Sequence, residues 1–486
     1  MKTDNYPSSA LNYQLAGAAM GLAMALLFAD ACQQDGPLHF LFARWAWEHP
    51  LLFVDVWSRP LFTGLYAFPA RLGYQATRLF TVAISVAVAW QTARLAAELG
   101  LARAPLAGLL VWLQPSFFLF SAENMTEPIF ALVYGIALRL HHRGRMRAGM
   151  LVASLMILAR PEGLFLGLLW GVWVIFGIGR PEPAALRWRR IPATALLASG
   201  LALWWLAAWA LSGDPLFLRH NWPANWPLTG TVYGAAGLLA YPVRLPEIVG
   251  LALLVPFFRG LYASLRRREL PTMTSSFLTI FLVHTVLRAY GMLGSAGYPR
   301  YCVTIAPAIA LLTLAGWNDL AALFAHVSRP VRRGCAAVIL GLSIFLNFIY
   351  ADGAEMSRDA RLIDRAHAWF REHPVPVARF VWSQPYACIR FDRDPWEQPP
   401  FTHDRERDRQ LLRDLPAGTL VYWDARIGPQ WFGLTADDLR AAGYRELYAE
   451  SQTLRGYVLD RSWFGFGGPR RQTAWLFFKP TAEKAQ

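Results

Sequence analysis

Residues 15–50 read LAGAAMGLAMALLFADACQQDGPLHFLFARWAWEHP. The first part of this stretch is apolar and is typical of a membrane-spanning helix, and it ends at Asp30. A second carboxylate, Asp35, follows shortly after. A carboxylate close to hydrocarbon loses hydration, which is costly unless the group is paired or serves a function. The stretch therefore predicts a membrane protein with acidic side chains where its first span ends.

The charge distribution supports this prediction. The first 350 residues contain 14 acidic residues against 27 Lys and Arg, so the net charge of +14 comes almost wholly from this part. Hydrophobic residues make up 55% of the chain. The basic residues are dispersed between apolar runs instead of forming one stripe, which is typical of polytopic membrane proteins and argues against nucleic-acid binding.

Apolar runs of helical length predict about eleven transmembrane helices. The expected spans are 12–29, 77–95, 104–121, 127–140, 148–159, 163–179, 191–211, 243–258, 274–291, 300–316 and 333–350. We therefore expect an all-α polytopic bundle over residues 1–350.

Four basic loops lie between these spans: HHRGRMR, GRPEPAALRWRR, FRGLYASLRRREL and SRPVRRG. The stretches that separate them each fit two crossings, so all four can lie on one side, which the positive-inside rule makes cytoplasmic. We expect an integral protein of the bacterial inner membrane, with the N-terminus in the cytoplasm. An odd number of spans then places the C-terminal part outside.

The composition changes from about residue 351, where charges become dense and mixed in sign. A helical period runs through 354–373, and TADDLRAAG at 435–443 has the pattern of a capped helix with a Gly stop. Short strands are predicted at VARFVW, TLVYWD and TAWLFF. Residues 351–486 are therefore expected to form a small soluble α/β domain on the extracytoplasmic side.

The predicted orientation puts most acids of the first part at or near the outer surface. They are Asp30, Asp35, Glu48, Asp55, Glu123, Glu127, Glu162, Asp214 and Glu247. In SAENMTEP, Glu123 and Glu127 would share one face if a helix extended back over both. Alternatively, Thr126 is the N-cap and Glu127 lies in the first helical turn. Capping and catalysis do not exclude each other.

Several arginines are expected at the same outer boundary. Arg160 lies beside Glu162 in ARPEG, Arg300 follows Tyr298 in GYPRYCV, and Arg59 lies in WSRPLF. A guanidinium beside phenols at headgroup height suits a lipid phosphate, but it equally suits a salt-bridged turn or an interfacial anchor. No P-loop, GxGxxG, HExxH or GxSxG is found, and the four cysteines form no CxxC pair.

Together these segments resemble the GT-C superfamily of membrane glycosyltransferases, which use polyprenyl-phosphate-linked sugars. The superfamily includes protein O-mannosyltransferases, aminoarabinose transferases and oligosaccharyltransferases. The resemblance covers about residues 10–350. It rests on DGPLHFLFAR in the first outer loop, WSRPLFTGLYAFPARLG, ENMTEPIFAL after the third span, LARPEG after the fifth span and YPRY before a late span.

The resemblance implies an essential acid in the first outer loop. A D-x-x-x-H register like that of the oligosaccharyltransferase loop assigns this role to Asp35, followed by His39, while distance from the membrane favours Asp30. The second acidic motif would match Glu123 and Glu127. Their spacing departs from the usual D-x-D or E-x-D, so the pattern does not decide whether they bind a divalent cation such as Mg or Mn.

The donor phosphate would be bound by residues at the outer boundary, for which the candidates are Arg300, Arg160, Arg59, Tyr298 and His39. In the C-terminal part, VYWDARIG partly matches the W-W-D-Y-G acceptor motif of oligosaccharyltransferases at Trp423 and Asp424. These two residues are either the end of a strand or a contact to the acceptor.

We therefore expect an enzyme that moves a sugar from a polyprenyl-phosphate donor to a lipid, glycan or protein acceptor on the outer face of the membrane. The carboxylate of the first loop would take the proton of the acceptor, and cations would stabilise the leaving phosphate. A transporter or flippase of lipid-linked sugars, or a scaffold of envelope assembly, is the alternative.

Overall fold

The computed structural model describes residues 8–28, 35–179, 190–222, 234–352, 356–399, 401–402, 404–457 and 466–480. The chain divides into two compact units. The described residues of the first, the helical unit, are those from 8 to 28 and from 42 to 352; those of the second, the sheet unit, are 35–41 and the residues from 356 onward.

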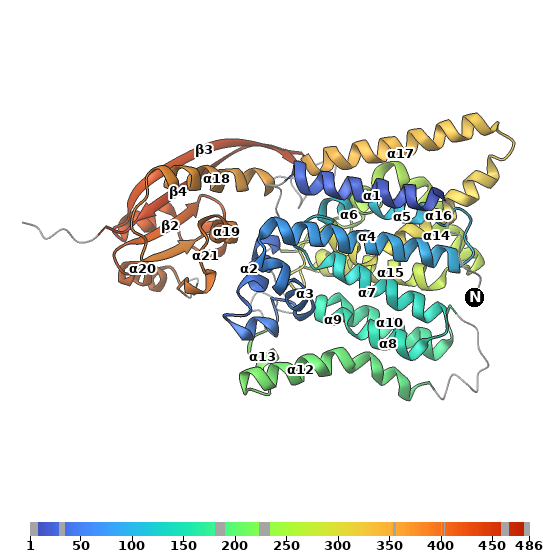
Figure 1. Cartoon of the computed structure of the whole chain (residues 1–486), viewed down its shortest axis with the longest axis horizontal. Helices are drawn as coiled ribbons and strands as arrows, with labels where there is room; N and C mark the ends of the chain where they lie inside the picture. The colour runs from blue at the N-terminus through green and yellow to red at the C-terminus, as the bar shows by residue number, and fades with distance from the viewer. Residues whose placement is uncertain are drawn as a thin grey trace, which may run out of the picture. The chain divides into compact units, whose positions relative to one another are not determined.

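Most of the described residues from 8 to 352 are helical (Figure 1). The helices are α1 (Ser8–Leu27), α2 (Asp35–Trp45), η1 (Pro50–Phe53), α3 (Pro60–Arg71), α4 (Tyr74–Glu98), α5 (Leu106–Trp112), α6 (Pro115–Phe120), α7 (Glu127–His142), α8 (Met146–Ser154), α9 (Met156–Ala159), α10 (Glu162–Phe176), η2 (Pro192–Ala198), α12 (Ser199–Ser212), α13 (Phe217–His220), η3 (Pro242–Arg244), η4 (Pro246–Gly250), η5 (Leu251–Leu253), α14 (Leu254–Arg267), α15 (Pro271–Tyr290), η6 (Pro299–Ile305), α16 (Ala306–Leu323) and α17 (Arg329–Asp352).

Each predicted span coincides with helical segments of this unit. Among the described residues, five helices are long and apolar enough to cross a membrane: Tyr74–Glu98, Pro192–Ser212, Pro242–Arg267, Pro299–Leu323 and Arg329–Ala351. Three shorter apolar helices accompany them: Leu11–Leu27, Met146–Ala159 and Glu162–Phe176. The predicted polytopic helical fold is confirmed.

Several predicted spans are not continuous α-helices, and two of them are interrupted at a Pro or a Gly. The span at 104–121 breaks between α5 and α6, where Pro115 lacks the N–H that a continuing helix requires. The span at 243–258 begins with 3-10 and π-helical turns before α14 starts. Gly250, at φ 101°, lies at this irregularity, and a Cβ there would meet the carbonyl oxygen of Leu113 at 3.1 Å.

The segment expected to be the first outer loop is also partly helical, because it contains α2, η1 and α3. In α3, Phe62, Tyr66 and Ala70 recur every four residues and are all buried. This helical spacing forms one apolar face, which packs against α4 and α9.

Small residues allow close packing inside the helical unit. Helices α14 and α16 pack along their length, with Gly260 and Gly316 at the crossing. A Cβ at Gly260 would lie 1.8 Å from the carbonyl oxygen of Leu312, and one at Gly316 would lie 1.8 Å from that of Pro256. Only glycine permits such an approach of two helices.

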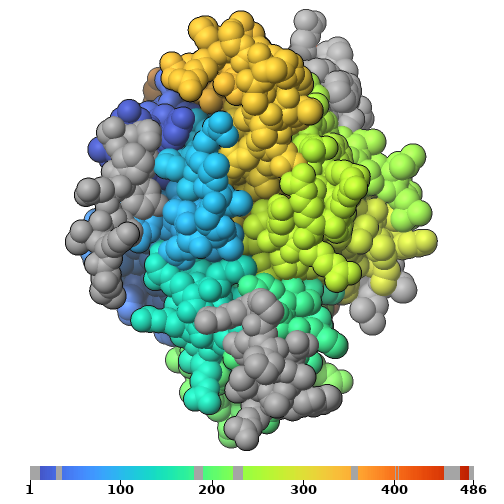
Figure 2. All heavy atoms as spheres, turned by 90° about the vertical axis from the view of Figure 1, so that its right-hand side faces the viewer, coloured from blue at the N-terminus to red at the C-terminus, as the bar shows by residue number. Residues whose placement is uncertain are grey.

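The described parts of the basic loops gather at one end of the helical unit, which Figure 2 faces. Polar contacts join the helix ends there: Arg143 to Glu98 at 2.7 Å, Arg103 to Asn318 at 2.8 Å, Arg267 to Asp319 at 3.2 Å and Arg332 to the carbonyl oxygen of Ala321 at 3.5 Å. Residues 180–189 of the loop GRPEPAALRWRR lie outside the described residues. A single basic end is what the positive-inside argument requires.

The sheet unit has four strands in the order β1-β2-β4-β3, with β1 parallel to β2 and the other pairs antiparallel. Its elements are α18 (Met356–Glu372), β1 (Arg379–Trp382), α19 (Pro385–Phe391), η7 (Pro395–Glu397), α20 (Arg405–Asp414), β2 (Thr419–Asp424), α21 (Ile427–Phe432), α22 (Ala436–Ala441), β3 (Arg445–Tyr457) and β4 (Phe466–Phe478). The predicted α/β character is confirmed, and β3 is a strand that the sequence pattern did not reveal.

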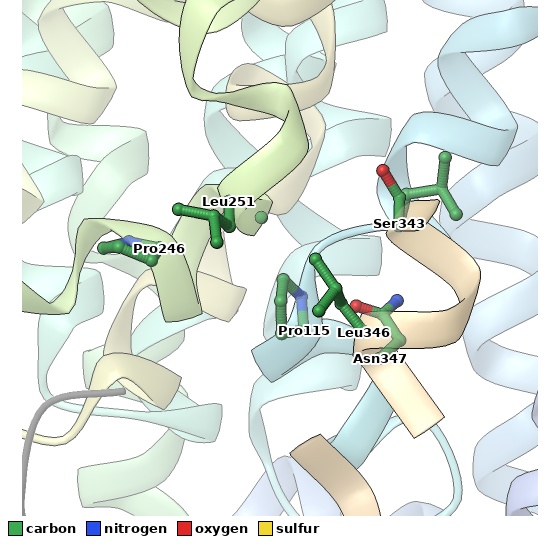
Figure 3. Close-up of a pocket in the computed structure, with 8 residues that line it drawn as sticks. Pro115, Pro246, Leu251, Ser343, Leu346 and Asn347 are labelled. Carbon is green, nitrogen blue, oxygen red and sulfur yellow. The ribbon is translucent and has the colours of Figure 1, made fainter. Parts of the chain in front are cut away.

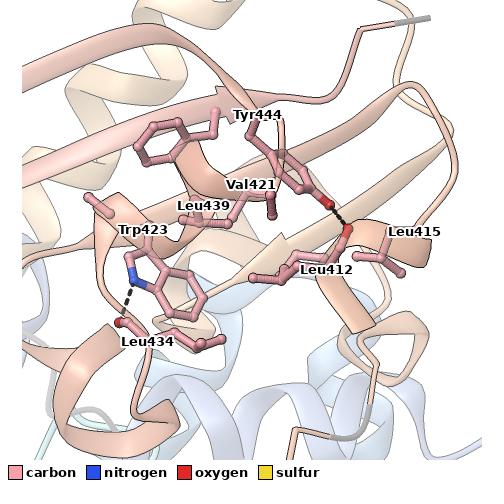
Figure 4. Packing of buried hydrophobic residues seen from close by; sticks show 11 residues of the cluster. Leu412, Leu415, Val421, Trp423, Leu434, Leu439 and Tyr444 are labelled. Atoms are coloured by element: carbon pink, nitrogen blue, oxygen red, sulfur yellow. Dashed lines mark hydrogen bonds between the residues drawn. The ribbon is translucent and has the colours of Figure 1, made fainter. Parts of the chain in front are cut away.

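The core of the sheet unit lies between β2 and helices α20 and α22 (Figure 4). Two polar atoms in it are satisfied by backbone carbonyls: Trp423 Nε1 donates to Leu434 at 3.1 Å, and Tyr444 Oη donates to Leu412 at 3.0 Å. Helix α22 begins with a capping box of Thr435 and Asp438, as its sequence predicted.

Candidate active site

A buried carboxylate, Glu127, lies at the first residue of α7. Its Oε1 is 2.8 Å from Nη1 of Arg160, which directly follows α9. Both side chains are removed from solvent inside the helical unit. A buried ion pair needs further hydrogen bonds to offset its desolvation, so the partners of Arg160 decide how the pair is held.

All three guanidinium nitrogens of Arg160 contact acceptor oxygens. Its Nη2 lies 2.8 Å and its Nε 3.2 Å from Oε1 of Glu162, in the same ARPEG segment. Its Nη1 also donates to Oγ1 of Thr126 at 3.0 Å. The guanidinium therefore uses one edge for Glu162 and the other for Glu127 and Thr126, which makes it a rigid clamp between two segments.

Thr126 occupies the N-cap position of α7, as one of the two sequence interpretations held. Its side chain makes no capping hydrogen bond to the helix backbone, however. The hydroxyl accepts from Arg160 instead. The other interpretation, in which a helix extends back so that Glu123 and Glu127 share a face, is wrong because α7 begins at Glu127.

Arg300, from η6, approaches the same carboxylate. Its Nε lies 3.5 Å from Oε1 of Glu127, and the side chain is buried. Aromatic rings surround the guanidinium, with centroid distances of 4.9 Å to Tyr298, 5.9 Å to Tyr301 and 6.0 Å to Phe120. Rings hold the cation in place through cation–π attraction without occupying its hydrogen-bond donors.

His284 of α15 closes the other side of the cluster. Its ring stacks on Tyr301 at 4.4 Å, and its Nε2 lies 3.6 Å from Oε1 of Glu162. The histidine is buried together with both neighbours. Four elements, α7, α10, α15 and η6, thus bring their polar side chains to one place.

Glu123 belongs to a second pair beside this cluster. Its Oε1 lies 3.9 Å from Nη2 of Arg78, a completely buried residue near the start of α4. Arg78 also donates to the carbonyl oxygens of Ala25 at 2.9 Å, Phe28 at 2.8 Å and Ala122 at 2.9 Å. It therefore ties the end of α1 to the loop that contains Glu123.

The residues of the predicted first loop divide between the two units. Asp35 is the first residue of α2 and is half-buried, and His39 is buried on the same helix. Both belong to the sheet unit, whereas the cluster belongs to the helical unit. Asp30 lies outside the described residues. Arg59 precedes α3 and donates to the carbonyl oxygen of Val56 at 3.0 Å.

The two candidate acceptor residues are buried in β2. Trp423 is part of the core described above, and Asp424 accepts hydrogen bonds from Ser383 Oγ at 2.7 Å and Gln472 Nε2 at 3.0 Å. Ser383 donates to Oδ2, whereas the backbone N–H groups of Arg426 and Ile427 donate to Oδ1, which also accepts from Gln472. These contacts favour the interpretation of the pair as the end of a strand.

A separate buried pair lies in the irregular segment before α14. Nη1 of Arg244 is 3.1 Å from Oε2 of Glu247, to which Tyr350 Oη donates at 3.2 Å. A small pocket adjoins this segment and is lined by Pro246 and Leu251 on one side and by Asn347 on the other (Figure 3). The sequence pattern did not indicate Arg244 as a candidate site residue, because Arg244 lies within an apolar stretch.

Among the described residues, no group of three His, Cys, Asp or Glu side chains has the arrangement of a metal site. The acids of the cluster are instead matched by arginines. Arg78, Arg160 and Arg300 stand against Glu123, Glu127 and Glu162. Ionisable side chains buried within membrane helices are costly and commonly mark a functional site.

The chain has a helical unit with a buried cluster of acids and arginines and a small sheet unit, and this fold matches that of solved structures. Two solved structures carry this likeness: ArnT from Cupriavidus metallidurans in the apo state, with a TM-score of 0.62, and the same protein bound to undecaprenyl phosphate, with a TM-score of 0.61. Each is 13% identical to this chain, and the match covers 96% of this chain and 98% of ArnT.

No protein-family model matches the sequence, and comparison with curated proteins finds no match. The likeness to ArnT shows that the two chains share a fold, as the expected polytopic architecture with a small C-terminal α/β part requires.

Proposed function

We propose that the protein is a membrane glycosyltransferase that moves a sugar from a polyprenyl-phosphate donor to an acceptor at the outer face of the membrane. The observation that carries this proposal is the convergence of two buried guanidiniums, Arg160 and Arg300, on the carboxylate of Glu127. The fold shared with a protein that was solved with undecaprenyl phosphate supports a lipid phosphate as the ligand.

Arg300 is the better candidate for the phosphate. Arg160 holds two carboxylates at 2.8 Å each, whereas the contact of Arg300 Nε with Glu127 is longer, at 3.5 Å. A phosphate oxygen can replace such a long contact more readily than a short one. Arg160 then acts as a positioning residue that keeps Glu127 and Glu162 in place.

In the proposed reaction, Asp35 takes the proton of the acceptor hydroxyl or amine while the acceptor attacks the anomeric carbon of the sugar with inversion. The bond between that carbon and the phosphate oxygen breaks, and the polyprenyl phosphate leaves with the electron pair. Arg300 stabilises the charge of the leaving phosphate.

A flippase for lipid-linked sugars is the second candidate, and one observation favours it. The segment from Pro242 to Leu253 is an interrupted helix with a buried Arg244–Glu247 pair. Interrupted helices and buried charges are features of transporter binding sites.

One experiment separates the two functions. Purified full-length protein in liposomes is given a panel of polyprenyl-phosphate sugars that carry a radiolabel on the sugar. A glycosyltransferase releases the labelled sugar from the lipid, either into water or onto an acceptor in an added extract. A flippase moves the intact lipid to the other leaflet. A protein that does neither with any donor contradicts both proposals.

A further inference from the structure

We propose that the basic end of the helical unit binds the headgroup of an anionic phospholipid. The site is a collar of six arginines: Arg266, Arg267 and Arg268 at the end of α14, and Arg329, Arg332 and Arg333 at the start of α17. This proposal is independent of the proposed transferase activity. It concerns the end of the unit that Figure 2 faces.

The two halves of the collar meet at the end of α16. Arg267 Nη1 lies 3.2 Å from Oδ1 of Asp319, and Arg332 Nη1 donates to the carbonyl oxygen of Ala321 at 3.5 Å. Arg267 also lies 3.8 Å from Glu269. Among the described residues, the other five arginines of the collar form no ion pair with an acid. The collar therefore has an excess of positive charge.

Local structure indicates that these arginines reduce the stability of the fold in three ways. Arg268 has φ 57°, the left-handed conformation that favours glycine just past a helix end. Three arginines in the first turns of α17 oppose the helix dipole, which favours anions there. Nε of Arg332 is buried and has no hydrogen-bond partner among the described residues. A bound anion would offset the unfavourable helix-dipole interaction and would give Arg332 Nε an acceptor.

The surroundings of the collar favour a lipid over a soluble anion. Large apolar side chains lie between the arginines and are exposed: Leu265 is 55%, Leu323 60% and Val331 54% accessible. The collar also lies where three apolar helices end, at Arg267, Leu323 and Arg329. Alternating cations and apolar side chains at this height match a phosphate headgroup with its acyl chains.

The test uses native mass spectrometry of the full-length protein in detergent with equal amounts of phosphatidylglycerol and phosphatidylcholine. We expect selective retention of phosphatidylglycerol by the wild type, weakened about tenfold or more in R266Q/R268Q and in R329Q/R333Q. These variants leave Arg267 and Arg332 and their contacts in place. A matched control, R371Q/R407Q, removes two exposed arginines of the sheet unit and should retain the lipid like the wild type.

Thermal unfolding in detergent provides a second readout. Phosphatidylglycerol should raise the unfolding temperature of the wild type more than that of either collar variant, and inorganic phosphate at the same concentration should have no such effect. Equal retention of phosphatidylglycerol by wild type and both variants would overturn the proposal. Equal stabilisation by inorganic phosphate would also overturn it, because the site would then bind a soluble anion.

Discussion

The carboxylate of Glu127 lies 2.8 Å from the guanidinium of Arg160, and both side chains are buried in the helical unit. The two residues lie at opposite ends of the stretch that contains α7, α8 and α9. Because Glu127 also contacts Arg300, any ligand of Arg300 must compete with this carboxylate. In the proposed transferase, Glu127 therefore links the stability of the fold to the binding of the donor phosphate.

Replacement of Arg300 should weaken donor binding. A charge-assisted hydrogen bond contributes roughly 1.5–3 kcal/mol, so R300A should reduce affinity for the lipid donor about ten- to a hundredfold. R300K should restore only part, since an ammonium keeps the charge but loses the two-pronged geometry. Binding of a fluorescent polyprenyl phosphate measures this, with the exposed Arg71 replaced in the control R71A. Unchanged affinity in a folded R300A would contradict this role of Arg300 and would make Arg160 the candidate that binds the phosphate.

Substitution of Glu127 should separate stability from binding. E127Q keeps the shape but removes the charge that compensates Arg160 and Arg300, so we expect a loss of roughly 1–3 kcal/mol in unfolding free energy. Donor affinity should be unchanged or higher, because the competing carboxylate is gone. Thermal unfolding and donor titration are measured together, with E269Q at an exposed acid as the control. A large fall in donor affinity with unchanged stability would contradict the proposed competition.

The proposed base can be tested in the same preparation. D35N should fold and bind the donor but transfer sugar at least ~100-fold more slowly, the usual scale for loss of a general base. E48Q, which removes a partly exposed acid of the same region, should keep full activity. If D30N is inactive and D35N is active, Asp30 is the base. If both variants keep activity, the carboxylates of the first loop have a structural role.

Arg78 should be essential for stability. Its donors satisfy carbonyl oxygens at the end of α1 and in the loop before α7, so R78L removes the donor of these buried acceptors and the ion pair with Glu123. We expect a destabilisation of about 3–5 kcal/mol, visible as a lowered unfolding temperature in detergent. R78K should recover only a fraction. R147L, at an exposed position, serves as the control.

The stability of the sheet unit should depend on pH through Asp359. Burial raises the pKa of this carboxyl from 3.8 to about 6, although Arg426 lies 2.6 Å away and acts in the opposite direction. The folded state thus holds the proton more tightly than the unfolded state. The free energy of unfolding should therefore fall as pH rises from about 4 to about 6, and it should be constant above pH 6. The total fall is about 3 kcal/mol, at ~1.4 kcal/mol per pKa unit.

Hydrogen exchange of peptides from α18 and β2 between pH 4 and pH 7 measures this change, after correction for the intrinsic exchange rate. D359N removes the titrating group and should flatten the profile. D437N, at an exposed acid of the same unit, should leave the profile as it is. A profile in D359N identical to that of the wild type would assign the pH dependence to another group.

Much of the architecture was predictable because it depends on local patterns. Apolar runs identify membrane helices, since backbone groups inside a bilayer must bond within one segment. The change in charge density near residue 351 indicated a different unit, and the T-A-D-D pattern indicated the capped helix α22. The interruptions at Pro115 and Gly250 were not predicted, although Pro115 was a visible signal.

The candidate site was predicted only in part. Glu127, Arg160 and Arg300 were singled out because charges beside apolar runs are costly. Arg78 and His284 were overlooked because each lies within a predicted span, where the average hydropathy hides a single polar residue. A charged residue inside an otherwise apolar helix was the available signal.

The sequence by itself determined which segments are helical, where polar groups enter the apolar part and that a small α/β unit follows. Tertiary structure decided the partners: Glu127 with Arg160 and Arg300, and Glu123 with Arg78. These partners come together through helix packing, which depends on close contacts such as that between Gly260 and Gly316. Such contacts join residues far apart in the chain, and local periodicity carries no information about them.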